Sequence, residues 1–208
     1  MRLSPSNFIQ ILAATAAKQL VALPTLLSVE QSQQLPLLQQ STMSNQDQPH
    51  TLEQAAVLIS DVMGRDRSMN VFAGFTRDVA TVSYRLDSAT QNSTVLAPLN
   101  SAIEKLPRKP WEDPNDYNTF GANAYDGSDG QDRAQRNLQR FVEAHMLPLS
   151  PWPENKKVKS LLDGDREIWW ETKGDVKVIQ PDGIEVKNIA SKVGNGEVWL
   201  LQGTRNYA

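Results

Sequence analysis

Few side chains in this sequence have the types and the spacing that catalysis requires. The chain contains no cysteine and two histidines, His50 and His145. Thiolate nucleophiles, cysteine-zinc sites and disulfides are therefore excluded, and a Ser-His-Asp triad would have to use one of these two histidines. The phosphate-binding glycine loop and the His-Glu-x-x-His motif of zinc proteases do not occur in the sequence. We therefore expect neither a metal site nor a cofactor.

One set of residues could do chemistry, namely carboxylates on neighbouring predicted strands. Glu171, Asp175 and Glu185 lie close together in the sequence, and Trp169 and Trp170 precede the first of them. Glycoside hydrolases use two carboxylates roughly 5–10 Å apart across a cleft. Acids that face each other across a sheet are common, however, and consecutive strand residues point to opposite faces. A glycan-acting enzyme is therefore the alternative, and a non-catalytic protein that works through surface contacts is the leading hypothesis.

The composition is that of a globular protein with polar extensions. Hydrophobic residues make up 39% of the 208 residues and charged residues 22%, which leaves room for one domain of about 150 residues. The formal net charge of -3 argues against nucleic acid as a partner, since nucleic-acid binders normally carry a basic patch. The apolar runs are short and interrupted by polar residues, so we predict no integral membrane span.

Residues 1–27 have the pattern of a secretory signal peptide. Arg2 precedes an apolar run over residues 8–17, and no acidic residue occurs before Glu30. Residues 28–50 are rich in glutamine and serine, which predicts a disordered linker. The expected location is the secretory route, either the vacuole or the extracellular space and cell wall. The alternative is a structural protein of the mitochondrion, because mitochondrial presequences are also basic and free of acids.

The rest of the chain, residues 51–208, has the pattern of one domain. Its first half is mostly helical by the spacing of apolar residues. Thr51 and Gln54 fit a capping box at the first helix start. The predicted helices cover residues 51–63, 69–82 and 134–146.

A polar stretch and a set of strands complete this domain. Residues 107–133 contain three prolines and many Asp, Asn and Gly residues, which predicts a long insertion loop. After residue 158 the pattern changes to alternation broken by Asp-Gly, Lys-Gly and Asn-Gly turns. The predicted strands are 94–97, 167–172, 176–179, 184–189 and 197–201. Helices in the first half and strands in the second indicate an α+β fold.

Three segments, in this order and spacing, resemble the motifs of the fasciclin domain family. Residues 94–103 (TVLAPLNSAI) are similar to the first motif, Thr-Val-Phe-Ala-Pro-Thr-Asn followed by a helix. Residues 138–148 are similar to the central segment that holds the family's histidine. Residues 188–203 are similar to the second motif, in which Asn-Gly precedes a strand. The residues that carry the resemblance are Thr94, Pro98, Asn100, His145, Asn195 and Gly196.

The resemblance implies a fasciclin-like β-sandwich or wedge of two sheets with helices packed against it. It also implies adhesion, or association with a cell wall, matrix or vacuole, without a general catalytic activity. The Asp-rich insertion is similar to fungal members of the family. Ala144 stands where a tyrosine often precedes the histidine, so the integrin binding linked to that Tyr-His region in animal members is not carried over.

The remaining candidate residues concern modification and partners. Asn92 begins the one Asn-x-Ser/Thr sequon of this sequence, which predicts a glycoprotein if the chain enters the secretory route. His145 is expected to be buried and bonded to backbone or to Asn100. The insertion is the predicted binding surface, because loops carried by a rigid scaffold commonly contact partners. Its candidate contact residues are Trp111, Tyr117, Phe120 and Tyr125, and the expected partner is a protein or polysaccharide at the cell surface, wall or vacuole.

Overall fold

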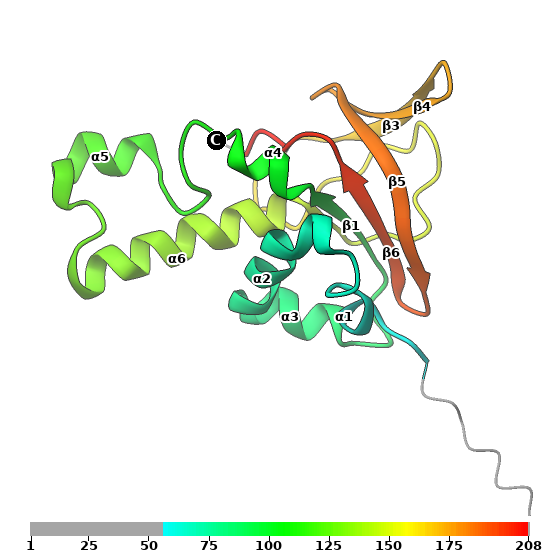
Figure 1. Cartoon of the computed structure of the whole chain (residues 1–208), viewed down its shortest axis with the longest axis horizontal. Coiled ribbons are helices and arrows are strands. Elements are labelled where there is room, and N and C mark those ends of the chain that lie inside the picture. The colour runs from blue at the N-terminus through cyan, green and yellow to red at the C-terminus, as the bar shows by residue number, and fades with distance from the viewer. Residues whose placement is uncertain (1–55, 208) are drawn as a thin grey trace, which may run out of the picture. The chain divides into compact units, whose positions relative to one another are not determined.

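Six strands form one mixed sheet in the computed structural model, which describes residues 56–207 (Figure 1). The described residues belong to one compact unit, Thr51–Ala208. The strand order is β2-β1-β6-β5-β4-β3, and the central pair β1 and β6 is parallel, whereas the other pairs are antiparallel. The strands are β1 (Ser93–Pro98), β2 (Met146–Leu147), β3 (Trp169–Lys173), β4 (Val176–Gln180), β5 (Ile184–Val193) and β6 (Gly196–Leu201).

The helices precede most of the strands in the sequence, which confirms the α+β fold. Figure 1 shows α2, α3 and the C-terminal part of α6 beside the β1–β6 part of the sheet. The α-helices are α1 (Ile59–Val62), α2 (Asn70–Asp78), α3 (Ala80–Leu86), α4 (Asn100–Glu104), α5 (Pro114–Phe120) and α6 (Gly127–Ala144). Two 3-10 helices, η1 (Arg67–Met69) and η2 (Gly121–Asn123), connect them.

The two sheets that the fasciclin resemblance implies are two parts of this one sheet, joined by β5. The first residues of β5 pair with β4, through Ile184 and Glu185. The rest of β5 pairs with β6, with register shifts after Val186 and after Ile189. Because bulges bend a strand and increase its twist, β5 can belong to both parts.

Strands β1 and β6 are buried along their whole length, because apolar clusters cover both faces of the sheet. On the helical face, Val95 and Val198 pack with Phe72 of α2 and Phe141 of α6. A second cluster, which includes Trp152, Trp170 and Trp199, packs against the other face. Burial on both faces explains why residues 95–98 of β1 form a continuous apolar run without alternation.

The predicted helix boundaries were partly wrong. Residues 56–58 are not helical, and α1 has four residues. The reason is tertiary: the carbonyl of Val57 accepts the amide of Gly194, and the amide of Ile59 donates to the side chain of Asn195. The signal peptide (1–27), the linker (28–50) and the capping box of Thr51 and Gln54 lie outside the described residues.

The predicted loop over residues 107–133 is also largely helical. It contains α5, η2 and the beginning of α6, which starts at Gly127, seven residues before the predicted start. Asp113 caps α5 by accepting the amide of Asn115, and Pro114 occupies the first helical turn, where its missing N–H costs nothing.

The turn between β5 and β6 holds the sheet to the helices through Asn195 and Gly196. The Asn195 side chain is buried: Oδ1 accepts the amide of Ile59 at 2.8 Å, and Nδ2 donates to the carbonyls of Leu86 and Ser88 at 2.8 and 3.0 Å. Gly196 has φ of 149°, and a Cβ at this position would lie 1.8 Å from the carbonyl oxygen of Ser93. Only glycine permits this approach of β1 to β6.

Asn195→Ala is expected to lower the free energy of unfolding by about 2–4 kcal/mol, because it leaves the Ile59 amide and two carbonyls without their partner. Urea denaturation monitored by circular dichroism measures the change. The matched control is Asn188→Ala on β5, whose exposed side chain forms no hydrogen bond with the described residues and should change stability by less than about 0.5 kcal/mol. Equal effects of the two variants would contradict this role of Asn195.

Candidate interaction surface

A helical arm, residues 107–133, projects from the side of the fold that carries α6. Figure 1 shows α5 and the N-terminal end of α6 standing away from the sheet. None of the residues of α5 or η2 is buried.

Hydrogen bonds around Tyr125 hold the arm in shape. The amide of Asp113 donates to the Tyr125 hydroxyl at 2.6 Å, and this hydroxyl donates to Asp116 Oδ2 at 3.0 Å. Asn137 of α6 donates to the same Asp116 oxygen at 2.8 Å and to the carbonyl of Trp111 at 3.1 Å. Burial, together with this donation to Asp116, raises the pKa of Tyr125 above its usual value. Side-chain bonds thus connect the first turn of α5 to Tyr125 and to α6.

Gly130 allows the segment that contains Tyr125, which precedes α6, to pack closely against the start of that helix. A Cβ at Gly130 would lie 2.2 Å from the backbone carbon of Tyr125. The residue is buried, although the residues around it are exposed. Any side chain here would push the connection away from α6.

Two aromatic rings of α5 are exposed to solvent. Phe120 is 49% exposed and Tyr117 is 37% exposed. The guanidinium of Arg133 lies 4.1 Å from the Phe120 ring centre, and its Nε donates to the carbonyl of Ala124. The Tyr117 ring meets the Tyr125 ring edge to face at 5.4 Å, and its hydroxyl donates to Glu112. Both rings are therefore held in place while remaining accessible.

The four predicted contact residues thus fall into two groups. Tyr117 and Phe120 are exposed, whereas Trp111 and Tyr125 support the arm from inside. The Trp111 ring packs edge to face on Phe75 at 6.2 Å. Arg133, which was not predicted as a contact residue, belongs with the exposed rings.

His145 lies at the centre of the fold, with none of its surface exposed. The amide of Arg205 donates to Nε2 at 3.0 Å, so this nitrogen is an acceptor and the proton is on Nδ1. Nδ1 donates to the carbonyl of Phe141 at 2.8 Å. Burial lowers the pKa of His145 to about 3, and the neighbouring Arg205 guanidinium contributes. The imidazole is a neutral connector between α6 and the C-terminal segment.

Of the two predicted partners of His145, the backbone is the observed one. Asn100 instead accepts the amide of Val71 and donates to the carbonyl of Arg67, at 3.1 and 2.9 Å. It therefore links the start of α4, just after β1, to the start of α2.

A buried ion cluster around Arg205 was not predicted. The Arg205 guanidinium, with an exposed fraction of 0%, forms an ion pair with Asp165 at 2.8 Å and faces Asp182 at 3.5 Å. Ser160 donates to Asp165 as well, and Arg166 pairs with Asp182. Burial alone would raise the pKa of Asp165, but the hydrogen bonds from Arg205 and Ser160 outweigh it and lower that pKa.

The candidate catalytic carboxylates are not brought together in a cleft. Glu171 and Glu185 are both opposite Val178 on adjacent strands, which places them two strands, or about 10 Å, apart. Glu171 accepts from Gln180 and pairs with Lys173, and Glu185 accepts from Gln202. Among the cavities found on residues 56–207, none is lined by two of the three acids.

The other predicted residues take structural positions or lie on the surface. Thr94 donates to the carbonyl of Leu149 at 2.6 Å, and Pro98 ends β1. Asn92 is exposed immediately before β1. Trp170 is buried and Trp169 is half-buried on the opposite face. Within the described range 56–207, no three His, Asp or Glu side chains are grouped as metal ligands would be, and no helix has the length and apolarity of a membrane span.

Comparison with known proteins identifies the family. A FAS1 domain-containing protein of Neurospora crassa is 64% identical over 152 residues, and those of Aspergillus fumigatus and Emericella nidulans are 50% and 51% identical over 151 and 149 residues. These matches cover 73%, 72% and 71% of this chain. The chain belongs to the FAS1 (fasciclin) domain proteins, and these relatives are fungal.

The matches span 66%, 64% and 61% of the relatives' own lengths, which is slightly less than two thirds of each. No model of a known protein family matches the chain. Among solved structures, the chain is similar to a FAS1 domain pair from the insect cell adhesion molecule fasciclin I, with a TM-score of 0.49 and 11% identity, over 72% of this chain and 51% of that one.

The buried state of His145 predicts how stability depends on pH. The pKa in the folded protein, about 3, is below the value of 6.5 expected for an unfolded chain, so the unfolded state binds more protons between these pH values. Lowering the pH from 7 to 5 should therefore reduce the free energy of unfolding by about 2 kcal/mol. Urea denaturation at both pH values measures this. His145→Gln should be less stable at pH 7 but should lose most of the pH dependence; an unchanged dependence would refute the assignment.

Proposed function

We propose that this chain is a non-catalytic interaction protein of the secretory route, acting through surface contacts in the cell wall, at the cell surface or in the vacuole. The observation that carries the proposal is the pair of exposed rings on the arm, Tyr117 and Phe120, beside Arg133. Tyrosine, other aromatic residues and arginine are enriched at the centres of protein interfaces. Exposed rings that are already fixed lose little freedom on binding.

The partner proposed for the arm is a protein. A guanidinium stacked on a phenyl ring, with a neighbouring phenol, provides an apolar centre with polar edges, which matches the anatomy of protein interfaces. Membership of the FAS1 family, whose proteins are generally adhesive and non-catalytic, supports such a role. The particular partner is a question for experiment.

If the chain enters the secretory route, the fold leaves the sequon at Asn92 open to modification. The Asn92 side chain is exposed, and Arg85 bonds the backbone carbonyl of Asn92 and not its amide side chain. A glycan on Asn92 would therefore not displace a hydrogen bond of the fold. Although Thr94 is buried in β1, transfer of a glycan before folding would not be hindered by this.

Tyr117→Ser combined with Phe120→Ser is expected to abolish binding of the full-length chain to its partner on intact fungal cells, with a loss of at least about tenfold in affinity, because two anchor rings are removed. Binding of a fluorescently labelled chain to protease-treated and untreated cells measures the effect. The matched control is Val71→Ser with Val176→Ser, which removes apolar side chains that are 37% exposed each.

Control and arm variants that bind equally well, with unchanged melting temperatures, would remove the arm from the interaction. Loss of binding after protease treatment supports a protein partner. Binding that survives the protease but not a glycanase would instead indicate that the arm binds a polysaccharide.

Glycosylation of Asn92 is expected in a fungal host that expresses the full chain with a C-terminal tag. Endoglycosidase treatment should shift the electrophoretic mobility of the wild-type chain but not of Asn92→Gln. Sequencing the N-terminus of the same mature protein reports cleavage near residue 27. An unshifted band together with an intact N-terminus, or a mitochondrial location of the tag, would overturn the secretory assignment.

A further inference from the structure

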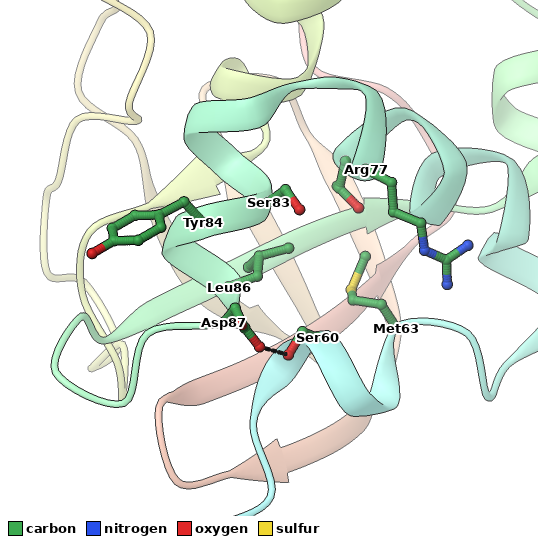
Figure 2. Close-up of a pocket in the computed structure, with 8 residues that line it drawn as sticks. Ser60, Met63, Arg77, Ser83, Tyr84, Leu86 and Asp87 are labelled. Carbon is green, nitrogen blue, oxygen red and sulfur yellow. Dashed lines mark hydrogen bonds between the residues drawn. The ribbon is translucent and has the colours of Figure 1, made fainter.

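A cavity between α1, α2 and α3 has the chemical character of a saccharide site. It has a volume of about 260 Å³ and lies on elements other than the arm. Figure 2 shows Ser60 of α1, Arg77 of α2, and Ser83 and Leu86 of α3 around it, with Asp87 at the end of α3. Pockets for drug-sized ligands measure about 300–1,000 Å³, so a group the size of one sugar ring is a suitable occupant.

Polar groups with unused hydrogen-bonding capacity surround this cavity. The Asp87 carboxylate accepts the Ser60 hydroxyl at Oδ1, at 3.0 Å, and Oδ2 has no partner among the described residues. The Arg77 guanidinium likewise forms no hydrogen bond or ion pair within residues 56–207, nor does the Ser83 hydroxyl. The guanidinium of Arg77, the carboxylate of Asp87 and the hydroxyl of Ser83 thus line the same cavity.

The floor of the cavity is apolar. Met63 is 2% exposed and Leu86 is 3% exposed, and both line the cavity. A pyranose ring has the complementary character, because its C–H groups form apolar patches inside a ring of hydroxyls. A hexose carries several hydroxyls, so different hydroxyls of one ring can accept from the Arg77 guanidinium and donate to the Asp87 carboxylate on the other side of the cavity.

The charge balance selects neutral ligands. One cation, Arg77, and one anion, Asp87, line the cavity, so a phosphate or carboxylate ligand would gain one attraction and one repulsion. The Tyr84 ring is 72% exposed and, in Figure 2, points away from the other side chains at one edge of the cavity. The ring therefore lies at the rim, where only a ligand that extends beyond the cavity would reach it.

We propose that this cavity, named here the α1–α3 pocket, binds a neutral hexose unit of an oligosaccharide, with Arg77, Asp87 and Ser83 holding the hydroxyls and Tyr84 supporting the adjoining residue. This site is independent of the arm and goes beyond the protein-binding function proposed above. The chain would then connect a protein partner, bound by the arm, with a polysaccharide.

The test is a titration of the ¹⁵N-labelled full-length chain followed by two-dimensional NMR. The probes are methyl α-mannoside, mannotriose and laminaritriose, and inorganic phosphate is the charged comparison. Saturable shifts of the amides of Ser60, Ser83 and Asp87 are expected with at least one neutral trisaccharide at concentrations on the order of 10 mM, and none with phosphate. No such shift with any of the sugars, or shifts with phosphate alone, would overturn the proposal.

Substitutions test whether Arg77 and Asp87 are responsible for the binding of sugar. Arg77→Ala and Asp87→Ala should each weaken trisaccharide binding about tenfold or more, since each removes hydrogen bonds to a charged group. The matched controls are Arg136→Ala and Asp129→Ala on α6, exposed residues without a hydrogen bond or ion pair to other described residues. Equal binding by pocket and control variants with unchanged melting temperatures would refute the assignment.

Two further variants test whether the α1–α3 pocket binds sugar independently of the arm. Tyr84→Ala should weaken the trisaccharide more than methyl α-mannoside, because only the longer ligand reaches the ring. Tyr117→Ser with Phe120→Ser should leave sugar binding unchanged, so that failure of the α1–α3 pocket and failure of the arm can be told apart. Loss of sugar binding in the arm variant would refute a separate site.

Discussion

The close approach of Gly196 to Ser93 is the constraint on which the central sheet depends. Parallel pairing of β1 with β6 brings together strands that are about a hundred positions apart in the sequence, and it begins at Ser93 opposite Gly196. The amide of Ser93 donates to the carbonyl of Asn195 at 2.9 Å, so the turn and the strand start are joined directly. Once these strands are paired, apolar clusters can cover both faces, because each strand projects large side chains to both sides.

Polar groups buried next to this sheet limit how the helices can be arranged. Asn195 fixes α1 and the end of α3, and His145 joins α6 to Arg205. Arg205 in turn is buried with Asp165 and Asp182. Burying such an ion cluster adds little net stability, but an arrangement that separated its members would leave a charge unpaired in the interior. The same bonds explain why the histidine is unsuited to proton transfer: both ring nitrogens are occupied, and its protonated form is disfavoured.

The sequence predicted elements that follow local rules. Strands β3, β4 and β5 are separated by the turns at Gly174 and Gly183, which are readable in the sequence, so they were found within a few residues. The helix predicted over residues 51–63 was wrong at residues 56–58, because the chain there is held by the turn at Asn195, a residue 136 positions from Ile59. Helix α5 could have been found, since Asp113-Pro114 is a readable helix start. No local sequence pattern indicated that Arg205 is buried, because its partners lie in distant parts of the chain.

The candidate sites, too, were predictable only where neighbouring residues in the sequence carry the feature. Aromatic residues in a polar insertion marked the arm, but sequence alone could not separate the exposed Tyr117 and Phe120 from the supporting Trp111 and Tyr125. The α1–α3 pocket had no local signature, since it combines residues from three helices. Both surfaces carry side chains that remain accessible to solvent, whereas the polar groups at the centre are mostly paired with each other. Because the interior polar groups of this scaffold serve cohesion, recognition has to come from side chains on its surface, such as those of the arm and of the α1–α3 pocket.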